Sequence, residues 1–300
     1  MNYEVCGMRF LFKNKYDEIR SGWALFLSVI VLFIVILLVG FSVALITGNG
    51  AVRLFNTPFA DYLLMSIAVL LLFWLIYKRP LKQMGLHSNK WFKQLMLGMA
   101  FGTILITLII VIMLASGLIQ FVDVNFNNLT NHLFWTGLLV FVGVGFFEEL
   151  FARGFIMTVL KTTRNKWVIL LLSSFIFGIL HVANPSVTPF ALINITLIGI
   201  LIGYLFIKTG RLWAAIGIHF AWNFVQGNIF GSLVSGIDTI SIVHIEVTGA
   251  EWLTGGEFGL EGGIICTFVV LLGLAYVHFC IKQNKNFWRI DSDMPLTRGL

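Results

Sequence analysis

Charge is scarce in this 300-residue chain, and the scarcity excludes most classes of soluble protein. Charged residues make up 11% of the sequence and apolar residues 58%, with a mean hydropathy of +0.93. Soluble proteins average about 25% charged and 45–50% apolar residues. A nucleic-acid-binding protein would need a basic patch on a soluble module, which the sequence lacks. The composition is typical of an integral membrane protein.

Cysteine is also scarce, and the three cysteines do not form a disulfide framework. Cys266 and Cys280 are 14 residues apart on one predicted helix. That separation is about 21 Å at helical rise, too far for a disulfide bond. We interpret Cys6, which precedes the first apolar stretch, as an ordinary cytoplasmic thiol. No disulfide bond is expected.

Long apolar stretches are what the chain has in abundance. A bilayer core of about 30 Å needs about 20 apolar residues in a helix. The stretches use most of residues 1–300, so we expect one membrane domain, an all-α bundle of about eight transmembrane helices around a buried polar site. The predicted helices are Ser21–Ile46, Ala60–Tyr77, Leu95–Ile119, Leu133–Leu160, Trp167–Val182, Phe190–Ile207, Leu212–Phe230 and Gly263–Ile281.

Lysine and arginine residues indicate the orientation of the bundle. Eighteen of them lie at the termini and in alternate loops, whereas the other loops offer only Arg53. This positive-inside signal predicts an even number of spans with both termini in the cytoplasm. Short loops and no organellar targeting segment favour a bacterial plasma membrane. The eighteen are Arg9, Lys13, Lys15, Arg20, Lys78, Arg79, Lys82, Lys90, Lys93, Lys161, Arg164, Lys166, Lys208, Arg211, Lys282, Lys285, Arg289 and Arg298.

Three of the predicted helices carry groups that hydrocarbon disfavours. An ionisable side chain at membrane depth costs about 2.5–3.5 kcal/mol even on the most lenient insertion scale, so it usually faces the bundle interior and marks a site. Counted from the cytoplasmic helix ends, His219 lies roughly 12 Å deep, Glu148 roughly 18 Å and His181 roughly 21 Å, which lets them converge near mid-membrane. They are Glu148, Glu149 and Arg153 on the fourth helix, His181 on the fifth, and His219 with Asn223 on the seventh.

The fourth helix separates two carboxylates. Glu149 and Arg153 are four residues apart, so they share a face and can form an ion pair. Glu148 points about 100° away, toward Gly145 and Ala152, whose small size should leave room for a water or a substrate backbone. We therefore expect Glu149 to be a structural carboxylate and Glu148 to be free for general-base chemistry.

The histidines lie where they can face the same space. Pro185 cannot continue a helix, so His181 falls in the last turn of a helix of about 24 Å. A helix that stops inside the membrane is tolerated where it borders a cavity. His219 and Asn223 are four residues apart and share a face. An imidazole beside a carboxamide suits a metal site with a hydrogen-bond donor, or an oxyanion-binding pair.

One acidic segment, residues 232–262, separates the last two predicted helices. It contains no basic residue, and we interpret it as a solvated external loop, with a lid over the site as the alternative. Its acidic residues are Asp238, Glu246, Glu251, Glu257 and Glu261.

Three motifs in order resemble the signature of the CPBP family of intramembrane proteases. They are Glu148-Glu149-x-x-x-Arg153, Phe177-x-x-x-His181 and His219-x-x-x-Asn223, within residues 133–230. The family includes the CAAX prenyl endopeptidases and bacterial enzymes linked to bacteriocin processing and self-immunity. The resemblance implies an eight-helix fold that hydrolyses a peptide bond within or beside the membrane. It implies that Glu148 activates the water, that His181, His219 and Asn223 surround it, and that Glu149 and Arg153 support them.

Two mechanisms stay open at this stage. In one, Glu148 acts as general base on a water with no metal present. In the other, Glu148, His181 and His219 bind a divalent metal such as zinc, as two histidines and one carboxylate with an open position. The expected partners are a membrane-associated peptide or protein substrate and the lipid bilayer, with no nucleic acid.

Two functions from other classes compete with the protease. A non-catalytic scaffold or bacteriocin self-immunity protein would keep the fold and bind a partner without cleaving it, but the intact motifs argue against it. A proton-coupled transporter would explain buried Glu and His but not the paired spacings. We therefore favour an intramembrane protease.

Overall fold

The computed structural model describes residues 11–13, 19–47, 59–77, 80–86 and 89–284. Expectations that fall outside these ranges concern only loop and terminal residues. They are those for Cys6, Arg9, Lys15, Arg53, Lys78, Arg79, Lys285, Arg289 and Arg298.

All eight apolar stretches form helices, as predicted. An asparagine or threonine side chain caps the N-terminus of three of these helices. Asn131 and Asn165 each accept a hydrogen bond from a backbone N–H of the first turn, and Thr188 does the same before Pro189, as N-cap residues do. The helices are α2 (Ser21–Thr47), α3 (Phe59–Tyr77), α4 (Trp91–Ala115), α5 (His132–Glu149), α7 (Lys166–Leu180), α8 (Pro189–Thr209), α9 (Leu212–Phe224) and α11 (Ile264–Cys280).

Two of the helices continue as π-helices. After α5 the chain runs through η3 (Leu150–Ile156) into α6 (Met157–Val159), and after α9 through η5 (Val225–Ile229). π-Helical turns inside longer helices frequently occur at functional sites. Short helices complete the chain: η1 (Leu81–Met84), η2 (Phe126–Thr130), η4 (Leu160–Thr163), α10 (Glu251–Thr254), η6 (Gly256–Phe258) and η7 (Leu260–Gly262).

One small sheet adds to the helical fold. Strand β1 (Ile119–Val124) pairs antiparallel with β2 (Val243–Val247), with an irregularity between Phe121 and Asp123. The expected helix end at Ile119 is therefore wrong. The helix stops at Ala115 because Gly117 takes a left-handed conformation (φ +67°), which glycine adopts without strain.

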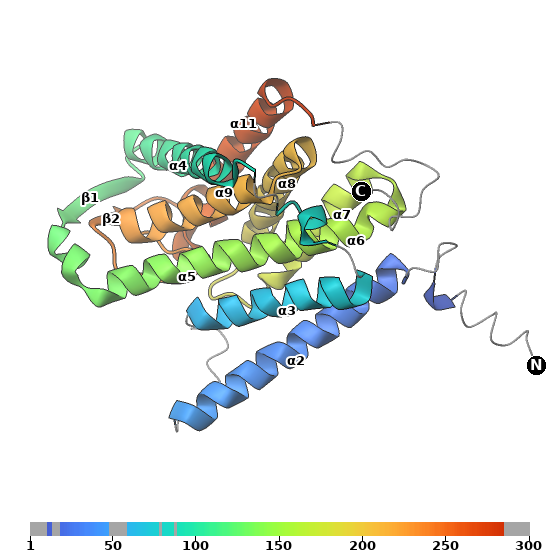
Figure 1. Ribbon diagram of the computed structural model, residues 1–300. Helices are drawn as coiled ribbons and strands as arrows, with labels where there is room; N and C mark the ends of the chain where they lie inside the picture. The colour runs from blue at the N-terminus through green and yellow to red at the C-terminus, as the bar shows by residue number, and fades with distance from the viewer. Residues whose placement is uncertain (1–10, 14–18, 48–58, 78–79, 87–88, 285–300) are drawn as a thin grey trace, which may run out of the picture.

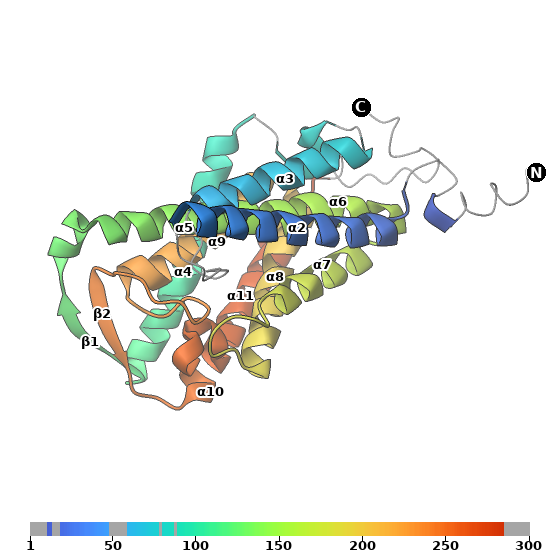
Figure 2. The same cartoon turned by 90° about the horizontal axis from the view of Figure 1, so that it is seen from below.

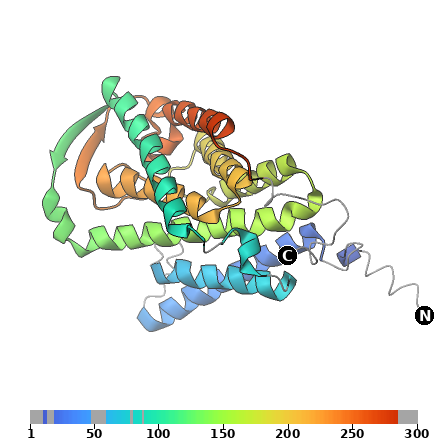
Figure 3. The same ribbon diagram turned by 45° about the horizontal axis from the view of Figure 1, so that its top comes forward.

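The helices surround α5, which crosses the middle of the molecule (Figure 1). On one side α3 packs on α5 and α2 packs on α3; on the other, α9 packs on α5 and α4 packs on α9. In a rotated view, α4 crosses over α9 (Figure 3). Helix α8 contacts α7 and α11. The sheet lies at one end of the bundle, near α10 (Figure 2).

Four helical runs among the described residues are long and apolar enough to cross a membrane. They are Phe59–Tyr77, Trp91–Ala115, His132–Val159 and Pro189–Thr209, while Ser21–Val35, Lys166–Leu180 and Ile264–Cys280 are shorter apolar helices. These lengths support a multi-pass membrane protein. That the chain crosses the membrane eight times and that both termini lie in the cytoplasm stay predictions.

The acidic segment is folded against the bundle, which corrects its interpretation as a solvated loop. Four of its acidic side chains are exposed, but Glu261 is only 3% exposed. The amide of Asn194 on α8 donates to the backbone carbonyls of Glu261 and Gly263, and β2 pairs with β1. These contacts join residues far apart in sequence, so the acidic composition of the segment did not indicate them.

Candidate active site

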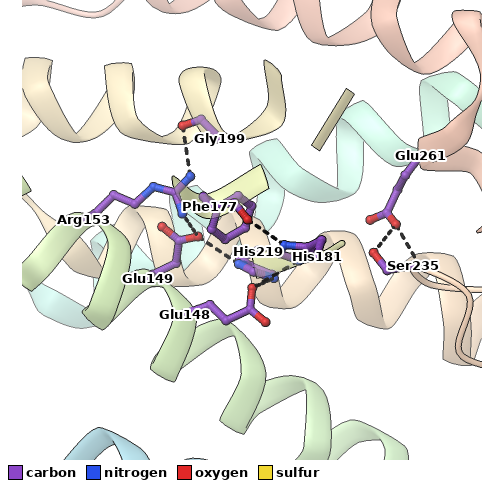
Figure 4. Close-up of polar contacts among 9 residues, drawn as sticks. All are labelled: Glu148, Glu149, Arg153, Phe177, His181, Gly199, His219, Ser235 and Glu261. Carbon is purple, nitrogen blue, oxygen red and sulfur yellow. Dashed lines mark hydrogen bonds and ion pairs between the residues drawn. The ribbon is translucent and has the colours of Figure 1, made fainter. Parts of the chain in front are cut away.

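The predicted ion pair between Glu149 and Arg153 is present at the junction of α5 and η3. Arg153 Nη1 donates to Glu149 Oε1 at 2.8 Å, and both side chains are fully buried. Arg153 Nη2 donates to the Gly199 carbonyl on α8 at 3.0 Å, and the guanidinium lies 4.3 Å from the centre of the Phe177 ring. The arginine therefore links the fourth predicted helix to the two that follow it (Figure 4).

Glu149 also holds His219, a contact that the sequence did not predict. Glu149 Oε1 lies 2.8 Å from His219 Nδ1. Since a carboxylate accepts hydrogen bonds, we assign the proton of the neutral ring to Nδ1. The other ring nitrogen, Nε2, then carries a lone pair. Helical spacing relates residues of one helix only, so it gave no signal for a bond between α5 and α9.

His181 is fixed in the same manner at the end of α7. Its Nδ1 lies 2.8 Å from the Phe177 carbonyl, which can only accept, so Nε2 again carries the lone pair in the neutral ring. The residue is the C-cap of the helix, as the break at Pro185 predicted. Both imidazoles are thus oriented by a bond at Nδ1, which leaves Nε2 for chemistry.

Glu148 faces both of these nitrogens. Its Oε2 lies 3.6 Å from His181 Nε2 and 3.8 Å from His219 Nε2, longer than a direct hydrogen bond. This oxygen has no hydrogen-bond partner among the described residues. Three acceptor atoms therefore converge without a proton donor between them, an arrangement that a bridging water satisfies.

The space beside Glu148 differs from the one expected. A Cβ at Gly145 would lie 3.1 Å from the backbone nitrogen of Phe220 on α9, so this glycine allows two helices to approach and does not leave room for water. Ala152 does line a cavity with Glu148, as expected. The open space beside Glu148 is therefore on the Ala152 side of the helix.

The cavity has a volume of about 640 Å³ and mainly apolar walls. Its polar lining includes Glu148, His181, His219 and Asn223. Asn223 is 6% exposed, and its side chain makes no hydrogen bond to any described residue, so the amide is available to a bound molecule. The cavity brings together the four residues for which sequence analysis predicted a shared site, drawn from α5, α7 and α9.

Two further polar residues of the cavity come from the acidic segment. Glu261 Oε2 accepts hydrogen bonds from Ser235 N (2.9 Å) and Ser235 Oγ (2.6 Å), and both residues line the cavity. The sequence did not indicate either residue as part of the site, because the acidic composition predicted a segment in solvent. The available signal was weak: Glu261 comes two residues before the last apolar stretch, closer to it than the other acids.

The separations between Glu148 and the two histidines are longer than those within a tetrahedral zinc site. The donor types of Glu148, His181 and His219 suit zinc, but tetrahedral ligands at about 2.0–2.1 Å lie about 3.3 Å from one another. The observed separations from Glu148 are 3.6 and 3.8 Å. Among the described residues, no three His, Cys, Asp or Glu side chains are placed to hold an ion.

One comparison with known proteins gives a match. Residues 130–225 match the family described as type II CAAX prenyl endopeptidase Rce1-like. The matched segment contains all three motifs. No curated protein and no solved structure matches the chain.

Proposed function

Because residues 130–225 belong to the CPBP family of intramembrane proteases, we propose that the protein is an endopeptidase that cleaves a membrane-associated peptide or protein. The observation that carries this proposal is the convergence of Glu148 Oε2 with the Nε2 atoms of His181 and His219, beside the free amide of Asn223 in one cavity. Peptide hydrolysis needs a base for water, a donor for the oxyanion and a proton for the leaving amine.

Glu148 and the two histidines position the attacking water. A water between these groups donates one hydrogen to Glu148 and the other to an imidazole Nε2. Glu148 takes the first proton as the oxygen attacks the substrate carbonyl carbon and the carbonyl electron pair moves to its oxygen. Glu148 passes this proton to Nε2 of His181, at the end of α7, and the imidazole delivers it to the nitrogen of the leaving amine. As the C–N bond breaks, the oxyanion electron pair re-forms the carbonyl, Glu148 is again ionised and His181 is again neutral.

Asn223 is the donor that we propose for the oxyanion. His219 was expected to share this role, but its Nδ1 proton points to Glu149, so the neutral ring has no proton to donate at Nε2. Its role is to orient the water. Glu149 and Arg153 hold that ring without touching the substrate.

Asn223→Ala should lower the rate of cleavage about 10²–10³-fold, the usual effect of removing one oxyanion donor. Peptide binding should change little, because the negative oxygen exists only in the transition state. The assay uses full-length protein in lipid vesicles with a mixture of apolar synthetic peptides, and counts new termini by mass spectrometry. The matched control is Asn127→Ala, which removes an exposed amide. Asn228 is unsuitable as a control because it is buried, so its substitution would test only packing. Equal cleavage by wild type and Asn223→Ala would remove Asn223 from the mechanism.

We further propose that hydrolysis does not use a metal. A metal-bound Glu148 would leave Glu149 as base, yet Glu149 Oε1 already accepts from Arg153 and His219. Purified protein should therefore contain no stoichiometric metal by elemental analysis, and cleavage should be unchanged in chelator. About one equivalent of zinc, lost together with activity in His181→Ala, would show that the two histidines bind an ion.

A further inference from the structure

Glu261 is a buried carboxylate that the proposed mechanism does not use. It is 3% exposed and lines the cavity that contains Glu148. Its Oε2 takes both hydrogen bonds from Ser235, while Oε1 accepts none from the described residues. Glu261 lines the cavity, so this oxygen is free to accept a hydrogen bond from a group that arrives from outside the chain.

The surrounding structure holds this carboxylate in place. Asn194 donates to the carbonyls of Glu261 and Gly263 and accepts in turn from Thr267. Ser235 has a positive φ of 49°, which few residues other than glycine adopt. In that conformation both its N–H and its hydroxyl reach the same oxygen of Glu261. Two donors on one oxygen favour the charged form of the carboxyl group.

The cavity contains no fixed positive charge to neutralise Glu261. Two carboxylates, Glu148 and Glu261, are among the described residues that line it, and no lysine or arginine is. Arg153, the nearest guanidinium to Glu148, is engaged by Glu149 and Gly199. Burial raises the pKa of Glu261, and the Ser235 hydrogen bonds oppose the rise. The lining therefore offers two carboxyl groups and no fixed cation.

We propose that Glu261 and Ser235 form a subsite that binds a cationic group of the substrate peptide, an ammonium or a guanidinium. The inference deepens the proposed function and rests on it. The bound cation would lie in the same cavity as the scissile bond, so the subsite would select which bond lies beside Glu148. The cation can be a basic side chain or a free amino terminus, and the experiment separates these two sources.

The test measures peptide binding and does not require cleavage. Full-length Glu148→Gln protein in lipid vesicles is titrated with three fluorescent peptides of leucine and alanine, followed by fluorescence anisotropy. The first is acetylated with a central lysine, the second is acetylated with norleucine in that place, and the third has norleucine and a free amino terminus. A charged hydrogen bond predicts at least about tenfold tighter binding of the lysine peptide than of its acetylated norleucine twin.

The variants connect that preference to the subsite. Glu261→Gln should reduce the lysine preference to about onefold, whereas Glu257→Gln, an exposed carboxylate of the same segment, should retain it. If Glu261→Gln does not accumulate, Glu261→Asp serves in its place. It keeps the charge on a shorter side chain, and it should reduce the preference.

Each outcome decides the proposal. Tight binding of the third peptide alone assigns the subsite to an amino terminus. Equal binding of all three peptides to the Glu148→Gln protein overturns the proposal, as does a lysine preference that survives in Glu261→Gln. Neither of these results depends on catalysis, so a failure of the subsite is distinguishable from a failure of the protease function.

Discussion

Glu148→Gln should reduce peptide cleavage by about 10²–10⁴-fold, the contribution of a general base, while the protein still accumulates in the membrane. Glutamine keeps the size of the side chain but cannot take a proton from water. The side chain is 23% exposed in the cavity and accepts no direct hydrogen bond at Oε2. The fold therefore loses little when the charge is removed, and the loss falls on activity.

The matched control for this variant is Glu257→Gln, which removes an exposed carboxylate far from the catalytic groups in sequence. Cleavage is measured by new peptide termini in vesicles, and accumulation by the amount of protein in purified membranes. If Glu148→Gln cleaves peptides as wild type does, Glu148 is not the base. If neither wild type nor Glu148→Gln cleaves peptides, but both rescue a phenotype that deletion of the protein produces, a binding or self-immunity function replaces the protease.

Arg153→Ala should destabilise the protein by about 3–5 kcal/mol, because it leaves a buried carboxylate without its counter-ion. Glu149 is completely buried, and Arg153 also supplies the hydrogen bond to the Gly199 carbonyl. We expect lower abundance and a lower thermal unfolding temperature, together with lost cleavage. Lys82→Ala, which removes an exposed cation, is the control and should change neither quantity.

A double variant separates the structural role of Arg153 from a role at the substrate. Arg153→Met with Glu149→Gln removes both charges, so its stability should recover part of the loss seen in Arg153→Ala. Cleavage should stay low, since His219 would lose the carboxylate that orients its ring. Normal abundance of Arg153→Ala with lost cleavage would instead place the guanidinium at the substrate.

The sequence by itself determined the helices and the pairing along each helix. Continuous apolar runs long enough to cross a bilayer specify helices because a helix makes all of its backbone hydrogen bonds within one segment. The spacing of Glu149 and Arg153 then specifies their ion pair, and Pro185 the helix end beside His181. These features depend on residues close together in the chain, which is why periodicity was sufficient to predict them.

Only the tertiary structure decided how the helices meet. The hydrogen bond from His219 to Glu149 joins residues 70 positions apart, and it supports our proposal that the histidine orients the water and does not bind the oxyanion. Strand β1 and the placement of Glu261 in the cavity depend on the return of residues 232–262 onto the bundle. Composition predicted a solvated loop because acidic residues usually lie in water. Burial of one of them required a partner, Ser235, and an anchor, Asn194, that local sequence does not indicate.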